Sequence, residues 1–346
     1  MNKDKINLYN CYQGNSNTID PIFQALDCFE QIGYLMLKGH NIVNPLFFCK
    51  SITPVFVEYK NQTRLELLRK NLWNEEWNIF QKEKVPVYES NYFEAIKDII
   101  DKGDCVSFST MFDLVYPYCW YDKDSKGNHC EHLSTIVDYD EENYYVIDSP
   151  FVFEPTRNKV CEFNKSVNII PIQYLHKGFE VHCNLFRLVL KENILDRYPN
   201  IIEIIKRNIE EYNCKYESEL EDCFIFYGHR ALIRLQKCVK SKEFKILEKT
   251  SFNSYWNIHL ILSRHILLRM CLVQEKEIFS DKQFDEILTQ LNQCIFLWDK
   301  LKVVIMKHCY KTDELLSFKD SVDAIVDNIL IQEDKLFDKL LLVVKN

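Results

Sequence analysis

Apolar residues recur every three or four positions between Pro21 and Leu37, which is the spacing of an amphipathic helix. Asp20, directly before Pro21, predicts an N-cap followed by proline at the first helical position. A second, shorter helix is predicted from Tyr92 to Ile100. Apolar and polar residues then alternate loosely from Val106 to Leu114, which predicts a strand. This part of the chain therefore mixes helix and strand.

Two further strand patterns, His132–Tyr139 and Asn143–Asp148, flank the acidic turn Asp140-Glu-Glu142 and predict a β-hairpin. Pairing across that turn puts Asp148 opposite about Ser134, on the same face of the sheet as His132. Diagonal neighbours of this kind lie ~7–8 Å apart, within reach of long side chains. A slip of one residue would reverse the face, so the register decides whether the two side chains can meet.

After about Tyr174 the pattern changes to long helical periods with few Gly or Pro breaks. Helices are predicted over Pro199–Tyr212, Ser218–Val239, Asn253–Gln274, Asp281–His308 and Asp313–Val344. The fold class expected is therefore α+β, with a mixed domain over residues 1–174 and an all-helical domain over residues 175–346. The helical half could serve as a substrate cap or as the interface of a homodimer.

The composition of the chain mainly excludes certain classes of protein. The chain of 346 residues has 47% apolar and 27% charged residues, as a globular protein does. Its net charge of −8 argues against nucleic-acid binding. Its first residues are polar and no apolar run is long enough to span a bilayer, so we expect a cytoplasmic protein without membrane contact. The 14 cysteines include no Cys-x-x-Cys pair, which favours reduced thiols.

One cysteine, one histidine and one aspartate supply the three residue types that cysteine-dependent acyl transfer needs. Cys11 precedes the first helix, His132 opens a strand, and Asp148 closes the next strand. A thiolate attacks, an imidazole moves the proton, and a carboxylate orients the imidazole. Asp138 and Asp140 compete for the last role but approach the exposed turn. An inert cysteine at position 11 is the alternative interpretation.

No metal or other cofactor is expected. The segment Asp122–Gly127 begins like a calcium loop, but Lys126 occupies a ligand position and no closing glutamate follows. Cys119, His129, Cys130 and His132 match no common zinc spacing. Five other histidines are interpreted as ordinary core or surface residues: His176, His182, His229, His259 and His265.

The segments Tyr9–Gln13, Phe112–Tyr118 and His132–Asp148 together resemble the N-terminal domain of the butirosin biosynthesis protein H family. That domain is distantly related to papain-like peptidases. The segment Phe112–Tyr118 is one residue shorter than its counterpart in the family, and Asp138 stands where the family usually has glycine. The resemblance covers roughly residues 6–175.

The resemblance implies a papain-like transacylase of thiotemplated antibiotic (nonribosomal peptide) biosynthesis. Such an enzyme moves an acyl group from a carrier-protein thioester, through acyl-Cys11, to a small amine or diamine acceptor. Gln13 or Asn10 would supply the oxyanion-hole donor. Asp113 could pair with an acceptor ammonium group and Tyr118 could line its channel, although both could equally be structural.

A basic stretch between Arg230 and Lys249 could dock an acidic carrier protein, or could be a solvated helix face. Two other functional classes remain open. A peptidase or thioesterase would use the same triad for hydrolysis, and a non-catalytic binding module would not need Cys11.

Overall fold

The computed structural model describes residues 22, 26, 28–39, 42, 44–49, 51–61, 65–69, 80–88, 91–111, 131–147, 151–154, 159–162, 168–181, 184–191, 200–214, 218–241, 243–244, 251–310 and 315–345. The chain divides into two compact units. The first unit comprises residues 1–44 and 78–197, and the second comprises residues 45–77 and 198–346.

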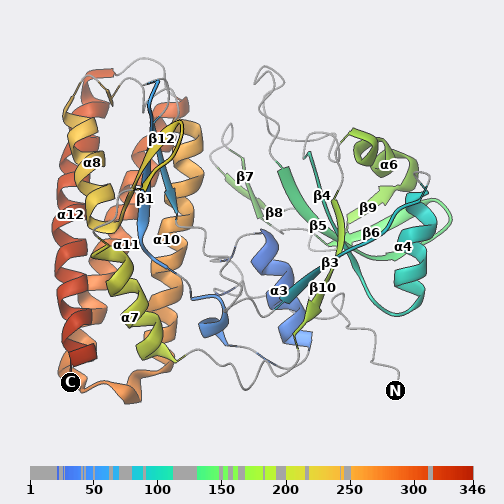
Figure 1. Ribbon diagram of the computed structural model, residues 1–346, viewed down its shortest axis with the longest axis horizontal. Coiled ribbons are helices and arrows are strands. Elements are labelled where there is room, and N and C mark those ends of the chain that lie inside the picture. Colours follow the sequence, from blue (N-terminus) through green and yellow to red (C-terminus); the bar gives the residue numbers. More distant parts are fainter. Residues whose placement is uncertain are drawn as a thin grey trace. The chain divides into compact units, whose positions relative to one another are not determined.

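The first unit is built on a six-stranded antiparallel sheet (Figure 1). In spatial order its strands are β3 (Phe80–Lys84), β10 (Asn184–Leu190), β4 (Val106–Met111), β5 (Glu131–Tyr139), β6 (Asn143–Ile147) and β9 (Asn168–Pro171). A separate two-stranded ribbon pairs β7 (Phe151–Glu154) with β8 (Lys159–Glu162).

Helices α4 (Tyr92–Asp101) and α6 (Ile172–Val181) cover one face of this sheet. Ile96 and Ile100 of α4, with Leu175 and Phe179 of α6, share a core with sheet residues such as Phe108. Asn91 caps α4, since its side chain accepts a hydrogen bond from the backbone N–H of Glu94. Residues 106–109 of β4 and 133–136 of β5 are all buried, so both faces of these two strands are covered.

Helix α3 (Cys28–Gly39) packs against β5, and its residues 30–37 are all buried. A bulky residue could not replace Gly33, because a Cβ there would overlap the ring of Phe80, lying 2.9 Å from Cζ. Phe80 pairs with Leu190, and strand alternation sets Leu190 opposite in direction to Leu185 of the α4–α6 core. Helix α3 therefore lies on the opposite face of the sheet from α4 and α6.

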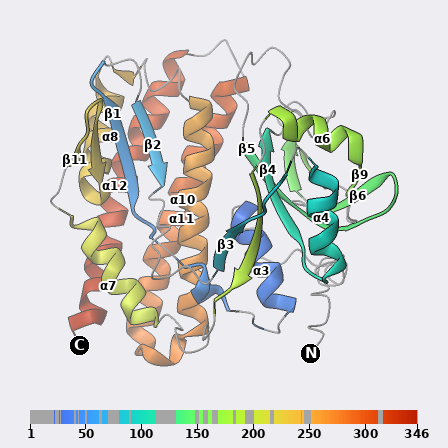
Figure 2. The same ribbon diagram turned by 45° about the vertical axis from the view of Figure 1, so that its right-hand side comes forward.

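The second unit joins long helices to a four-stranded antiparallel sheet (Figure 2). The strands, in spatial order, are β11 (Ser218–Glu219), β12 (Cys223–Tyr227), β1 (Pro54–Tyr59) and β2 (Leu65–Arg69). The helices are α7 (Ile201–Tyr212), α8 (Gly228–Lys240), α10 (Ser251–Gln274), α11 (Asp281–Tyr310) and α12 (Leu315–Lys345), with short 3₁₀ turns at Pro45–Phe47 (η1) and Lys276–Ile278 (η5).

One large hydrophobic core holds this unit together. Residues from α7, α8, α10, α11 and α12 meet there with Phe56 of β1 and Leu67 of β2. Helix α10 packs against α11, β2 and η1, and α12 packs against α7, α8 and α11. Residues on several sides of α10 are therefore buried, as expected for a helix inside a bundle.

Most predicted elements are confirmed. The hairpin forms as β5 and β6 around residues 140–142, and α4, α7, α10, α11 and α12 lie where the periodicity predicts helices. The first helix is confirmed from Cys28 onward, but Leu26 lies in a bend, so the predicted helix is not continuous from Pro21 to Leu37. Asp20 and Pro21 lie outside the described residues.

The all-helical prediction for residues 175–346 is wrong in detail, because β10, β11 and β12 lie in that range. The segment predicted as one helix over Ser218–Val239 is a hairpin followed by α8. Its run Cys223-Phe-Ile-Phe-Tyr227 is aromatic and β-branched, which favours a strand. Gly228, with φ of 53°, then turns the strand into the helix against the backbone of Tyr212.

The two compact units also differ from a division at residue 174. Strand β10 completes the sheet of the first unit, whereas β1 and β2 pair within the second unit. Long-range strand pairing of this kind leaves no local signal in the hydrophobic pattern. Among the helices that the structure describes, none has a stretch apolar and long enough to cross a bilayer.

We predict that Gly33→Ala destabilises the first unit by ~1–3 kcal/mol, since the added methyl group must displace the buried ring of Phe80. The check is urea unfolding followed by circular dichroism. Phe80→Leu provides the matched background, because it removes the atoms that the new Cβ would overlap. A Gly33→Ala cost that is the same in both backgrounds would show that this contact is not responsible.

Candidate functional site

The structure describes the framework around the predicted triad and little of the triad itself. His132 lies near the start of β5, where its Cα is paired with that of Thr110 in β4. The other predicted site residues lie outside the described residues: Asn10, Cys11, Gln13, Asp113, Tyr118 and Asp148.

The hairpin register is the one that the sequence predicts. Thr135 pairs with Ile147 and Ile136 with Val146, so the predicted pairing of Ser134 with Asp148 would continue the ladder by one residue. The register shifts between Ile136 and Asp138, on the turn side of these pairs. The shift moves the pairing by one residue, so the pairs Ile136–Val146 and Thr135–Ile147 differ in register from the pairs next to the turn.

Asp140, one of the two competing carboxylates, has a structural role in the turn. Its Oδ1 accepts hydrogen bonds from the backbone N–H groups of Glu142 and Asn143, at 2.8 and 2.7 Å. Its Oδ2 accepts one from the hydroxyl of Tyr145 at 2.8 Å. These hydrogen bonds hold the pKa of Asp140 below its usual value. Asp140 is therefore occupied in closing the hairpin.

A histidine on α6 forms a polar contact inside the α4–α6 core. The Tyr144 hydroxyl lies 2.9 Å from Nε2 of His176, and Tyr92 and Phe179 pack around the imidazole. Burial lowers the pKa of His176, partly opposed by the charge of Glu180. The arrangement is a neutral, hydrogen-bonded core histidine, as the sequence interpretation holds.

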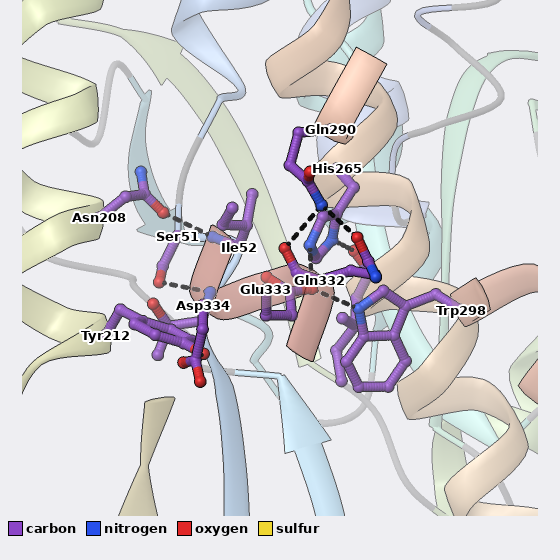
Figure 3. Close-up of polar contacts among 12 residues, drawn as sticks. Ser51, Ile52, Asn208, Tyr212, His265, Gln290, Trp298, Gln332, Glu333 and Asp334 are labelled. Carbon is purple, nitrogen blue, oxygen red and sulfur yellow. Dashed lines mark hydrogen bonds and ion pairs between the residues drawn. The ribbon is translucent and has the colours of Figure 1, made fainter. Parts of the chain in front are cut away.

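A fully buried carboxylate lies among the long helices of the second unit (Figure 3). Glu333 of α12 has no exposed surface, and its Oε1 accepts a hydrogen bond from the indole N–H of Trp298 on α11 at 2.6 Å. The same oxygen lies 2.8 Å from Nε2 of His265 on α10. Its Oε2 has no hydrogen-bond partner among the described residues. Glu333 thus links three helices through one oxygen.

His265 is also fully buried, and both of its ring nitrogens face oxygen atoms. Nδ1 lies 2.8 Å from the backbone carbonyl oxygen of Ile261, one helical turn earlier. Burial lowers the pKa of His265, but the charge and hydrogen bond of Glu333 outweigh it, and the net shift is upward.

The neighbours of Glu333 along α12 extend these contacts to other helices. The side-chain amide of Gln290 on α11 donates to the backbone and side-chain oxygens of Gln332, at 3.0 and 2.8 Å. Asp334 Oδ1 accepts from the Tyr212 hydroxyl on α7 at 2.7 Å and lies 2.8 Å from Nδ1 of His229 on α8. Residues 332–334, here called the α12 polar layer, therefore contact four neighbouring helices.

Sequence reasoning did not find the α12 polar layer. His265 and His229 were interpreted as ordinary residues, and no role was assigned to Glu333. A usable signal was present, because Glu333 occupies a core position of α12 between Ile329 and Leu336. A glutamate on an apolar helix stripe needs a buried partner.

Two cations of the basic stretch are engaged within the second unit. Arg234 pairs with Glu58 at 2.8 Å and with Glu243 at 2.9 Å, and Lys240 pairs with Asp327 at 2.8 Å. An acidic partner that docked on this stretch would therefore have to compete with these carboxylates for Arg234 and Lys240. Among the described residues, no group of three or more His, Cys, Asp or Glu side chains could hold a metal ion.

The chain matches no model of a known protein family, and no curated protein matches it.

We predict that Glu333→Gln lowers the free energy of unfolding by ~3–5 kcal/mol, because it breaks a buried charged contact with His265. Asp334→Asn is the matched control. It makes the same change on the adjacent, half-exposed residue and should cost only ~0.5–1.5 kcal/mol. Urea unfolding at pH 7 compares the two. Similar costs for both variants would contradict the central role of Glu333.

Proposed function

We propose that the protein is a cysteine-dependent acyltransferase with a papain-like first unit, which forms an amide from a carrier-protein thioester and an amine. Cys11 is the nucleophile, His132 the base and Asp148 the residue that orients the base. The proposal extends the resemblance to the butirosin biosynthesis protein H family.

The observation that supports the proposal best is the packing of α3 against β5. Helix α3 follows the segment that contains Cys11, and β5 contains His132. In papain-like enzymes the nucleophile precedes a buried helix packed on the sheet that supplies the base. The burial of residues 30–37 and the antiparallel β5–β6 hairpin agree with that arrangement.

Two exchanges make up the proposed reaction. The thiol of Cys11 attacks the thioester carbonyl, its proton passes to His132 and then to the departing carrier thiol, and acyl-Cys11 forms. The amine then attacks acyl-Cys11, gives up a proton through His132, and releases the amide and the free thiol. Thioester exchange is nearly isoenergetic and amide formation is downhill, so no nucleotide is required.

The substrate assignment follows from the same resemblance. An acyl- or peptidyl-carrier protein would donate the acyl group, and a small amine would accept it. The protease-like amide-forming enzyme of closthioamide biosynthesis is the example that suggests a diamine. Asp113 would pair with the second ammonium group and Tyr118 would line the channel. Asn10 or Gln13 would donate to the oxyanion with the backbone N–H of Cys11.

We predict that Cys11 is alkylated by iodoacetamide well below pH ~8.5, the usual pKa of a free thiol, because His132 favours the thiolate. Rates are measured at each pH by peptide mass spectrometry in wild type and in His132→Ala. Cys105 and Cys238 are internal controls, since burial raises the pKa of each thiol to about 12. The variant should lose the selective labelling of Cys11 and leave both controls unchanged.

A rate for Cys11 that His132→Ala does not alter would contradict the proposed pair. Product analysis then separates transfer from hydrolysis. A model acyl thioester with added diamine should give amide in wild type and none in Cys11→Ala. Free acid as the sole product would instead identify a thioesterase, and amide formation that survives Cys11→Ala would exclude the mechanism.

A further inference from the structure

Both nitrogens of the buried His265 ring face atoms that accept hydrogen bonds. The Ile261 carbonyl oxygen carries no proton, so Nδ1, 2.8 Å away, must carry one. Nε2 lies 2.8 Å from Oε1 of Glu333. With no proton between these two atoms, a nitrogen lone pair would face a carboxylate oxygen at hydrogen-bond distance, without water to separate them.

We infer that the second unit folds with one proton bound between His265 and Glu333, and that this proton holds α12 against α10 and α11. The proton count does not depend on where the proton sits. An imidazolium beside a carboxylate and a neutral imidazole beside a carboxylic acid contain the same number of protons. In both forms Oε1 can still accept the indole N–H of Trp298.

Among the titratable and charged groups near His265, Glu333 is the one that determines the protonation of the imidazole. Cys294 on α11 and Tyr212 on α7 both lie within the field of Glu333, and burial raises the pKa of each. Both therefore remain protonated at neutral pH. Asp334 is turned to Tyr212 and His229. On α10, the guanidinium of Arg264 donates to the carbonyl of Phe48, and the pKa of His259 is lowered to about 4, chiefly by burial.

Capture of this proton makes folding depend on pH with a definite sign. In the unfolded chain a glutamate ionises at ~4.3 and a histidine loses its charge at ~6.5, so at pH 8 the separated pair holds no shared proton. Because the folded-state pKa of His265 is raised, the stabilisation is complete below pH ~6.5 and falls as pH rises through the folded value. The shared proton therefore stabilises the folded second unit at neutral pH, and this stabilisation is lost toward alkaline pH.

The test counts protons released on unfolding. Calorimetric unfolding of the full chain at pH 8 is compared in phosphate and in Tris, buffers with different ionisation enthalpies. The control is the double variant His265→Gln/Glu333→Gln, which keeps polar side chains at both positions and cannot hold the proton. Wild type should release one proton more than the double variant. Equal proton release in the two proteins would overturn the inference.

A second measurement requires only wild type, in case the double variant does not fold. The ring ¹⁵N resonances of His265 are identified by their contact with the Trp298 indole N–H. They should stay constant from pH 6 to pH 8, because the proton remains on the pair. A titration centred near ~6.5, the value of an unpaired histidine, would overturn the inference.

Discussion

The Glu333 carboxylate has no exposed surface, and the second unit is organised around the groups that keep it buried. An unpaired charge in such a place would cost several kcal/mol, so α10 must supply His265 and α11 must supply Trp298 at the same level of α12. These contacts join α10, α11 and α12 at one level of the bundle. Hydrophobic burial drives the association of the helices, and the α12 polar layer adds directional contacts between them.

In the first unit, close packing between a helix and the sheet positions the elements relative to one another. Gly33 allows α3 to approach Phe80 on the sheet, and the buried residues of α3 then cover the face opposite to α4 and α6. The sheet is thus covered on both faces. Any chemistry of His132 would occur near the start of β5, where it pairs with the end of β4, and away from the hairpin turn that Asp140 closes.

The hydrophobic pattern predicted the helices and the hairpin, which depend mainly on interactions between residues close in the sequence. The β5–β6 hairpin, its register and five helices follow from periodicity, and Asp140 at the turn follows from Asx chemistry. The pairing of β1 with β12 and of β10 with β3 could not be predicted, because it joins segments more than 100 residues apart. The position of Glu333 on the apolar stripe of α12 indicates that it needs a buried partner, but the pattern does not identify His265, which lies 68 residues away on another helix.

The proposed acyl transfer requires a covalent intermediate on one thiol. The direct measurement is intact-mass spectrometry of the protein after brief exposure to an acylated carrier protein, without amine, followed by peptide mapping. The account predicts a mass increase equal to the acyl group, located on Cys11, which disappears when a diamine is added. Acylation spread over several cysteines, or no acylation, would contradict it.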